Sequence, residues 1–245
     1  ETKIMDLIYS LKNKVTIISE IHPQHHGSMS ELKRMILQSK IGGADYIKLQ
    51  LYNSQKLFNN NLRKYLEISQ EELKEITEYS RNIGIEPMAS IFDEEKIKWC
   101  EELEFKVYKI ASVTVQNQKL CEKIISLKKP VIVSLGMYDF EKKGKPFEDK
   151  NISYLYCVSK YPTNLSEIKM PNFKNSLFEG FSDHTIGIGA CLFAVSRGAK
   201  IIEKHFSLNK SLNCETEKAH VCSMNMEDLK SLRENCDTIS MLNSL

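Results

Sequence analysis

The chain has 245 residues, of which 42% are hydrophobic and 27% charged, with a formal net charge of +2. This length suits one large core, and the balanced charge offers no basic excess for binding nucleic acid or a membrane surface. No run of about 18 apolar residues is present, so no membrane-spanning helix is expected. The seven cysteines form no CxxC pair, and the first residues lack a secretory pattern, which favours free thiols in the cytoplasm. We therefore expect a single cytoplasmic domain over residues 1–245.

Short β-branched runs alternate with longer helical patterns along the chain, as in a parallel sheet built from βαβ units. The expected strands are Val15–Ser19, Tyr46–Gln50, Ile85–Ala89, Val107–Ala111, Val131–Ser134, Ser153–Cys157, Gly180–Ser182 and Ile201–Lys204. The expected helices are Ser30–Ile41, Ser69–Asn82, Glu94–Glu102, Gln116–Leu127, Ile188–Arg197 and Met226–Asn243. Ser69 and Glu72 form a capping-box pattern, and Asp93 suits an N-cap.

Eight such units favour closure into a (β/α)8 TIM barrel over an open sheet. No GxGxxG or GxxxxGK[ST] segment is present, so dinucleotide and P-loop chemistry have no support. Residues 137–150 are rich in lysine and include Gly144 and Pro146. This composition predicts a reduced helix between strands 5 and 6.

Polar side chains occupy the carboxyl ends of the expected strands, where barrel enzymes build their active sites. They are Glu20, Lys48, Gln50, Ser90, Lys109, Ser112, Ser134, Ser159, Tyr161, Ser182, Asp183, His184, Glu203, Lys204 and His205. Charged residues avoid sheet interiors unless they are paired. Three lysines entering one barrel mouth would repel one another, so the pattern predicts a bound phosphate or carboxylate among them.

Two histidines, His184 and His205, stand on the last two strands and suit a divalent metal with open positions for substrate and water. Asp183 is a candidate partner for the His184 ring. A second cluster, His22, His25 and His26, follows strand 1 and is more typical of surface histidines, because no carboxylate stands at metal-ligand spacing.

Several motifs in these positions resemble the barrel domain of the sialic acid synthase family. The longest is GFSDHTIGIGACLFAVSRGAKIIEKHF at Gly180–Phe206, which is similar to the family's FSDHT…EKHF pattern. The others occur in family order: Glu20-Ile21 with His25-Gly27, then KLQ at 48–50, YKIAS at 108–112, KPVIVSLGM at 129–137 and Tyr161-Pro162-Thr163. The resemblance covers roughly residues 15–210. It implies a condensation of phosphoenolpyruvate with an N-acetylated hexosamine to give a nine-carbon sugar acid.

The resemblance also implies roles for matching residues. His184 and His205 would hold Mn²⁺ or Mg²⁺, and Glu20 would be the catalytic carboxylate. The phosphoenolpyruvate ligands would be the catalytic lysines Lys48 and Lys109, together with Ser90, Ser112, Ser134 and Ser182. The sugar would face Gln50 and Tyr161, and the remaining substrate-site candidates are His25, Ser159, Asp183 and Lys204. The expected partners are phosphoenolpyruvate and a small sugar aldehyde. Members of the family usually dimerise, so the resemblance is compatible with a homodimer.

Departures from the family pattern fall on the sugar side. Ser159 stands where the family has Asn, and His22 and Gln24 replace a Gly and an Asn. The family's PGPDH motif is replaced by LNCETEKAH, so its sugar-contacting Asp is missing, and no antifreeze-like C-terminal domain is recognised within the 245 residues. We therefore expect the same reaction class with a different acceptor.

Two alternatives stay open at the level of sequence. A related synthase could act on a phosphorylated aldose, which would need a further basic cluster, and Arg34, Arg63 and Arg197 do not obviously converge. A barrel that has lost catalysis could instead bind a sugar or a partner synthase. Retention of Glu20, both histidines and the lysines argues against that second alternative.

Overall fold

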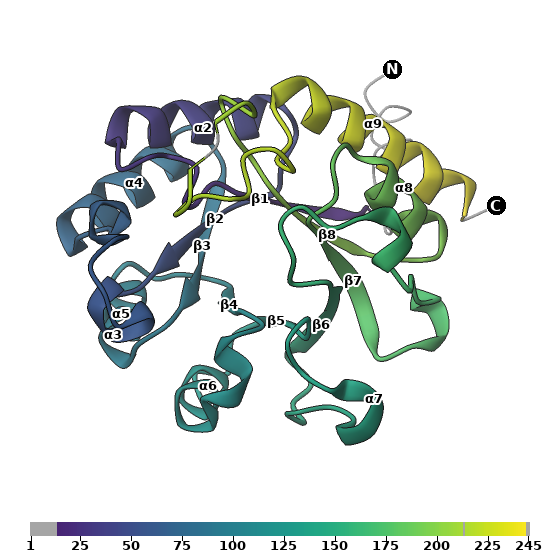
Figure 1. Cartoon of the computed structure of the whole chain (residues 1–245), viewed down its shortest axis with the longest axis horizontal. Coiled ribbons are helices and arrows are strands. Elements are labelled where there is room, and N and C mark those ends of the chain that lie inside the picture. The colour runs from purple at the N-terminus through teal and green to yellow at the C-terminus, as the bar shows by residue number, and fades with distance from the viewer. Residues whose placement is uncertain (1–13, 213, 244–245) are drawn as a thin grey trace, which may run out of the picture.

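The computed structural model describes residues 14–212 and 214–243, and its centre is a closed barrel of eight parallel strands in the order β1 to β8 (Figure 1). The strands are β1 Thr16–Glu20, β2 Tyr46–Leu51, β3 Glu86–Ile91, β4 Tyr108–Ile110, β5 Val131–Ser134, β6 Ile152–Cys157, β7 Phe178–Asp183 and β8 Ile201–His205. The ring closes where β1 pairs with β8, from Thr16 opposite Ile201 to Glu20 opposite His205. The predicted TIM barrel is confirmed, and the eight expected strands are found with ends that differ by at most two residues.

Helices surround this barrel. They are α2 Met29–Ile41, α3 Ser54–Phe58, α4 Gln70–Asn82, α5 Glu94–Glu102, α6 Gln118–Ile125, α7 Phe140–Lys143, α8 Gly189–Ser196 and α9 Met226–Leu242. The predicted caps are present: Ser69 and Glu72 form a capping box at α4, and the Asp93 side chain accepts from Lys96 N at α5. The sequence prediction misses α3, a short helix capped by Asn53.

The outer layer is thin beside β5 to β7. The expected reduced helix is α7, a single turn of four residues. A second reduction, not predicted, lies between β6 and β7, where residues 158–177 contain only the 3-10 turns Leu165–Glu167 and Phe173–Asn175. Pro162 and Pro171 explain it, because proline restrains the residue before it away from helical geometry.

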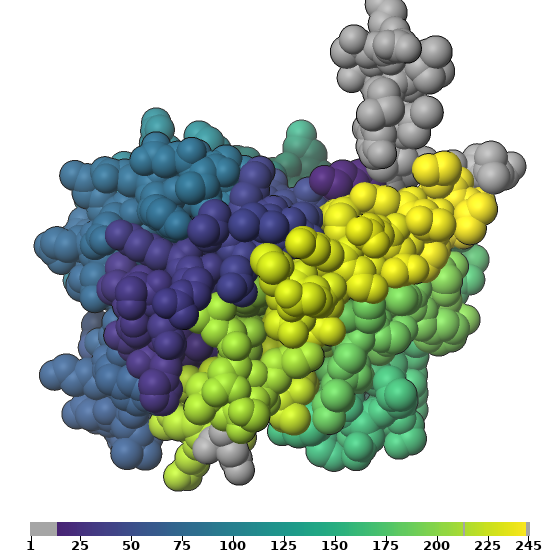
Figure 2. Space-filling view, turned by 90° about the horizontal axis from the view of Figure 1, so that it is seen from above, coloured from purple at the N-terminus to yellow at the C-terminus, as the bar shows by residue number. Residues whose placement is uncertain are grey.

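On the other side the helices pack closely against one another. Helix α9 contacts both α8 and α2, and Figure 2 shows α9 in yellow lying directly against α2 in purple. Leu229, Leu232 and Cys236 of α9 are fully buried there. Within the described ranges, no helix is long and apolar enough to cross a membrane.

The interior of the barrel is stacked in layers, because alternate side chains of each strand point inward. One layer is apolar and holds Ile18, Tyr46, Met88, Val107, Ile132, Leu155 and Ile201. Strand β7 contributes Gly180 at this level, where an added Cβ would lie 2.1 Å from the Ile201 carbonyl oxygen. Two residues further along each strand lies a second inward layer, formed by Glu20, Lys48, Ser90, Lys109, Ser134, Cys157, Ser182 and Glu203. The apolar layer therefore closes the barrel beneath a floor of polar side chains.

Candidate active site

A cavity of about 340 Å³ opens above this polar layer at the carboxyl ends of the strands. Twelve of the predicted site residues line it: Glu20, Lys48, Gln50, Ser90, Lys109, Ser112, Ser134, Ser159, Tyr161, Ser182, His184 and His205. Three predicted residues do not line it, namely His25, Asp183 and Lys204. Most of the predicted set therefore converges, from seven of the strands and from loops that include the one after β6.

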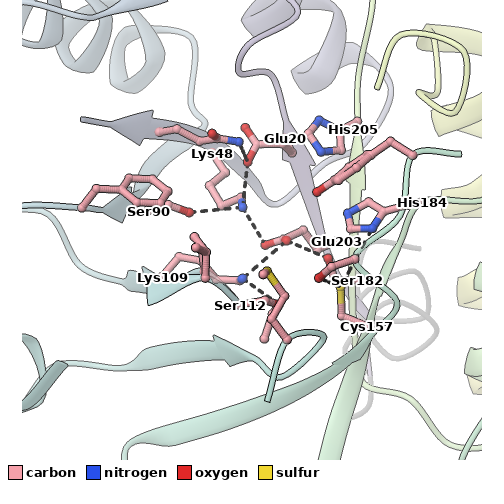
Figure 3. Close-up of a pocket in the computed structure, with 18 of the residues that line it drawn as sticks. Glu20, Lys48, Ser90, Lys109, Ser112, Cys157, Ser182, His184, Glu203 and His205 are labelled. Carbon is pink, nitrogen blue, oxygen red and sulfur yellow. Dashed lines mark hydrogen bonds and ion pairs between the residues drawn. The ribbon is translucent and has the colours of Figure 1, made fainter. Parts of the chain in front are cut away.

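Two lysines and two glutamates form a buried ionic network at the floor of the cavity (Figure 3). Lys48 Nζ lies 2.7 Å from Glu20 Oε2 and 3.2 Å from Glu203 Oε2. Lys109 Nζ lies 3.6 Å from Glu203 Oε1 and donates to Ser134 Oγ at 2.7 Å. Glu203 also accepts from Ser182 Oγ at 2.9 Å. We call Glu20, Lys48, Lys109 and Glu203 the ionic tetrad; its charges cancel within the cavity.

The tetrad controls the protonation of its own members. Burial lowers the pKa of Lys109 to about 8, although the Glu203 carboxylate opposes this effect. Burial alone would raise the pKa of Glu203, but Lys109 and Lys48 outweigh it and hold that pKa to about 2. Burial raises the pKa of Glu20 above its ordinary value despite the neighbouring Lys48. Glu20 is therefore the carboxylate of the tetrad that exchanges a proton more readily near neutrality.

Figure 3 places His184 and His205 next to each other on one side of the cavity, and their ring centroids are 5.7 Å apart. His184 Nδ1 lies 2.8 Å from the Val158 carbonyl oxygen, and His205 Nδ1 lies 2.8 Å from Gln24 Oε1. Both acceptors fix the Nδ1 proton, which leaves the Nε2 lone pair of each ring free. Asp183, the expected partner of His184, makes no such contact. The carbonyl of Val158 takes that place.

These two rings fit a divalent cation, because metal-bound imidazoles usually donate their other nitrogen to an oxygen acceptor, as both do here. In the described part of the chain, no group of three or more His, Cys, Asp or Glu side chains is arranged to hold a metal ion. The protein would therefore supply two ligands and leave the other positions to water and substrate.

The prediction that three lysines enter the barrel mouth is wrong for Lys204. Its Nζ lies 2.6 Å from Asp183 Oδ2 and donates to the Thr185 carbonyl oxygen at 2.7 Å. Both side chains of the ion pair are 0% exposed. Since Glu203 and His205 point into the barrel, Lys204 between them must point out, and Asp183 stands in the same way between Ser182 and His184. The expected repulsion is also absent, because each lysine has a carboxylate partner.

Of the histidines after β1, His22 and His25 are buried and are not surface groups, whereas His26 is exposed. His25 is only 3% exposed and lies behind the cavity wall, with its Nε2 3.2 Å from His22 Nδ1. His26 contacts a further buried carboxylate, Glu217, at 2.9 Å. Glu217 also accepts from Tyr65 and contacts His220 at 3.0 Å. This cluster joins the loops after β1, β2 and β8 around the rim of the barrel.

Several lining residues were not predicted. Glu203 was noted at the carboxyl end of strand 8 but was not assigned to the site, although the period of two along a strand gives it the same face as His205, two residues later. Cys157 occupies the same level on β6, and its Sγ lies 3.9 Å from His184 Nδ1. The outer wall adds an apolar group and one arginine: Leu57, Phe58, Arg63, Phe92, Val113 and Met137. No periodic signal in the sequence places Arg63 there.

Comparison with known proteins identifies the barrel. Residues 35–244 match the NeuB family. The chain is 30% identical over 250 residues to N,N'-diacetyllegionaminic acid synthase of Legionella pneumophila, covering 88% of this chain and 69% of that protein. It is 31% identical over 254 residues to pseudaminic acid synthase of Campylobacter jejuni, covering 91% and 73%. N-acetylneuraminic acid (sialic acid) synthetase of Leptospira borgpetersenii, solved with citrate, superposes with a TM-score of 0.84 at 29% identity, covering 95% and 86%. The resemblance expected from sequence is confirmed, and the chain belongs to the NeuB family of sialic-acid-type synthases.

Proposed function

We propose that this enzyme joins phosphoenolpyruvate to the open-chain aldehyde of an N-acylated amino sugar, releasing phosphate and forming a sialic-acid-like sugar acid. C3 of phosphoenolpyruvate bonds to the aldehyde carbon, water adds to C2, and the bond from C2 to the phosphate oxygen breaks. One water proton ends on the former aldehyde oxygen and the other on phosphate. The relatives named above as sialic, legionaminic and pseudaminic acid synthases support this reaction class.

One observation carries the proposal: the ionic tetrad and the His184–His205 pair share one cavity. A sugar-binding module has no need of buried lysines beside two imidazoles with free Nε2 atoms. Burying four charges is costly, and it is compatible with folding because they compensate one another.

The phosphoenolpyruvate side of the cavity lies at β4 and β5. Lys109 Nζ and the hydroxyl of Ser134 are in contact, and Ser112 Oγ accepts from the backbone N–H of Gly136 at 3.0 Å. An ammonium group and two hydroxyls in fixed positions provide charge-assisted donors for phosphate and carboxylate oxygens. Lys48, with Ser90 3.4 Å away, extends this surface toward the centre of the barrel.

Glu20 is the residue we assign to proton transfer. Its carboxylate accepts from the His22 backbone at 2.9 Å and from Gln50 Nε2 at 3.2 Å, in addition to Lys48. These contacts hold the carboxylate at the cavity surface, where it can orient the added water and remove its proton. The raised pKa of Glu20 makes it a stronger base than an exposed glutamate.

His184 and His205 would hold a divalent cation, Mn²⁺ or Mg²⁺, which polarises the aldehyde oxygen as a Lewis acid when bound. Tyr161 lies beside both rings, with centroid distances of 4.1 and 5.7 Å. Its ring bounds the space next to the histidines and restricts how an acceptor can approach them.

The proposal is tested by incubating the protein with phosphoenolpyruvate, Mn²⁺ and a panel of aldoses that includes N-acetylated hexosamines, while free phosphate is measured. We expect phosphate release that requires both an aldose and the cation. His184→Ala and His205→Ala should each lower the rate more than about a hundredfold.

A matched control is His26→Ala, because the His26 side chain is 51% exposed and does not line the cavity. This variant should retain most of the activity. Absence of phosphate release with every aldose would instead support the catalytically inactive binding barrel. Unchanged release in both alanine variants would refute the assignment of the two histidines.

A further inference from the structure

Among the described residues that line the cavity, Arg63 is the one Lys, Arg, Asp or Glu outside the ionic tetrad. It is half-buried, and its guanidinium carbon lies 4.7 Å from the centre of the Phe58 ring. Among the described residues, no carboxylate lies within 4.0 Å of its guanidinium nitrogens. The side chain is therefore held on an aromatic surface while its hydrogen-bond donors stay free.

The other positively charged side chains of the cavity have carboxylate partners, unlike Arg63. Lys48 and Lys109 are compensated by the two glutamates of the tetrad, so Arg63 leaves an uncompensated positive charge in the cavity. By contrast, Arg81 pairs with Glu86 at 2.8 Å, and Arg233 pairs with Asp45 at 2.7 Å. A guanidinium that lacks a partner and faces a cavity suits a phosphate or carboxylate, whose oxygens match its planar donors.

The position of Arg63 separates it from the phosphoenolpyruvate side. Its charge acts on His22 and Tyr52, which follow β1 and β2, and contributes to lowering the pKa of His22. Of the proposed phosphoenolpyruvate ligands, Lys109, Ser112 and Ser134 come from β4 and β5 and the loop after β4. Lys48 and Ser90 stand on β2 and β3, and Lys48 lies one inward layer below Gln50. Gln50, predicted to face the sugar, is on β2. Arg63 thus shares the acceptor side of the barrel with Gln50.

The segment carrying Arg63 is fixed at both ends. Ser54 Oγ donates to the Asn60 carbonyl at 2.9 Å, and Ser54 N donates to Glu67 Oε1 at 2.6 Å. Tyr65, two residues after Arg63, donates to the buried Glu217. These contacts hold the arginine in place before a ligand arrives, which lowers the entropic cost of binding.

We infer that Arg63 selects the acceptor by binding an anionic group, a phosphate or a carboxylate, on the end of the sugar far from its aldehyde. The inference rests on the proposed function and deepens it, because it assigns an acidic acceptor to this chain. It agrees with the sequence-based expectation that the three arginines do not converge: Arg63 reaches the cavity, whereas Arg34 and Arg197 do not line it. Phe58 and Phe92 beside Arg63 would pack against the apolar face of such a sugar.

The test compares three acceptors at saturating phosphoenolpyruvate: N-acetylmannosamine, its 6-phosphate, and the uronic acid with a carboxylate at the same carbon. The wild type should prefer an acidic acceptor, and the better of the two assigns phosphate or carboxylate. Arg63→Gln should lower kcat/KM for the preferred acidic acceptor by about ten- to hundredfold. It should change kcat/KM for N-acetylmannosamine and KM for phosphoenolpyruvate less than about twofold, and Arg63→Lys should lie between.

Lys64→Gln is the matched control, since it removes a positive charge from the adjacent exposed residue that does not line the cavity. It should leave all three acceptors unaffected. Equal losses for acidic and neutral acceptors, a wild-type preference for the neutral sugar, or a raised KM for phosphoenolpyruvate would each overturn the inference. Calorimetric binding of the 6-phosphate and the uronic acid to wild type and Arg63→Gln supplies an independent readout. If the wild type binds an acidic sugar more tightly than Arg63→Gln but turns over no acceptor, the proposed condensation is refuted and the role of Arg63 in binding stands. If the wild type and Arg63→Gln bind the 6-phosphate and the uronic acid equally well, the role of Arg63 is refuted.

Discussion

Glu203 and Lys204 are consecutive, both are buried, and both are in ion pairs, but they belong to different parts of the molecule. Glu203 points into the barrel and completes the ionic tetrad that lines the cavity. Lys204 points outward, pairs with Asp183 and donates to the Thr185 carbonyl oxygen. The face of the strand, rather than the type of residue, decides which buried charge can meet a substrate.

The two groups also differ in what they can do with their charges. The Asp183–Lys204 pair is sealed from solvent, and its partners are fixed by the fold. The tetrad borders a cavity, so an incoming anion can compete with Glu20 and Glu203 for the two lysines. A buried ion pair behind a site supports the structure, and the same residue types at the site can support chemistry.

The largest effect is expected from a substitution that breaks the Asp183–Lys204 ion pair. Lys204→Met should lower the free energy of unfolding by about 3–5 kcal/mol, because it leaves Asp183 as an unpaired buried charge. KM for phosphoenolpyruvate should stay within about twofold of the wild type. Urea denaturation and initial-rate kinetics measure the two effects.

Two further variants control this experiment. Asp183→Asn combined with Lys204→Met should recover part of the lost stability, since an amide oxygen can still accept from Thr185. Lys119→Met, at a side chain that is 86% exposed, should change stability by less than about 0.5 kcal/mol. A large kinetic defect in Lys204→Met without destabilisation would place Lys204 in the active site after all.

A smaller effect is expected at a fourth buried carboxylate, Glu217. Burial alone would raise its pKa, but hydrogen bonds from His220, Tyr65 and His26 hold it to about 2. A depressed carboxylate pKa stabilises the fold above the unfolded value near 4.5, and this contribution is lost as the pH falls toward 2. Glu217→Gln should therefore cost about 2–3 kcal/mol at pH 7, and its difference from the wild type should shrink between pH 4.5 and 2.

Denaturation curves at several pH values check this window. Glu148→Gln is the control, because the Glu148 side chain is 81% exposed. A stability difference for Glu217→Gln that is independent of pH across the window would contradict the assigned pKa.

The smallest expected effect is on the pH dependence of the reaction, and it tests how the ionic tetrad sets the charge of Lys109. Because the pKa of Lys109 is about 8, kcat/KM for phosphoenolpyruvate should fall as the pH rises through 8 and the ammonium loses its charge. Glu203 raises that pKa, so Glu203→Gln should move the decline to lower pH, by about half to one unit. Rate profiles between pH 6 and 10 measure the shift, with Glu148→Gln as the unchanged reference. A decline that moves to higher pH in Glu203→Gln would show that Lys109 does not control it.

The fold could be predicted from the sequence because each strand and helix carries a local signal. Alternation of β-branched runs with capped helices identified the barrel, and the composition of 137–150 indicated the reduced α7. The reduction between β6 and β7 was missed, although Pro162 and Pro171 carried the relevant signal. Short α3 was missed as well, because five residues offer almost no periodicity.

The predicted positions of the candidate side chains were correct where strand position alone determines location. His184, His205, Lys48 and Lys109 converge because parallel strands of a barrel end at the same rim. Lys204 was misplaced because the alternation of faces along β8 was not applied to it. Arg63 could not be placed, since its location depends on the path of the loop between α3 and α4.

The cancellation of charge within the ionic tetrad bears on how a reaction cycle can end. Because Glu20 and Glu203 already pair with the two lysines, the folded protein needs no counterion from solution to balance their charges. If the two lysines bind phosphate as proposed, its departure returns them to their carboxylate partners instead of leaving them as unpaired buried ammonium groups. Product release would thereby be coupled to re-formation of internal ion pairs, which would return the cavity to its initial electrostatic state for the next turnover.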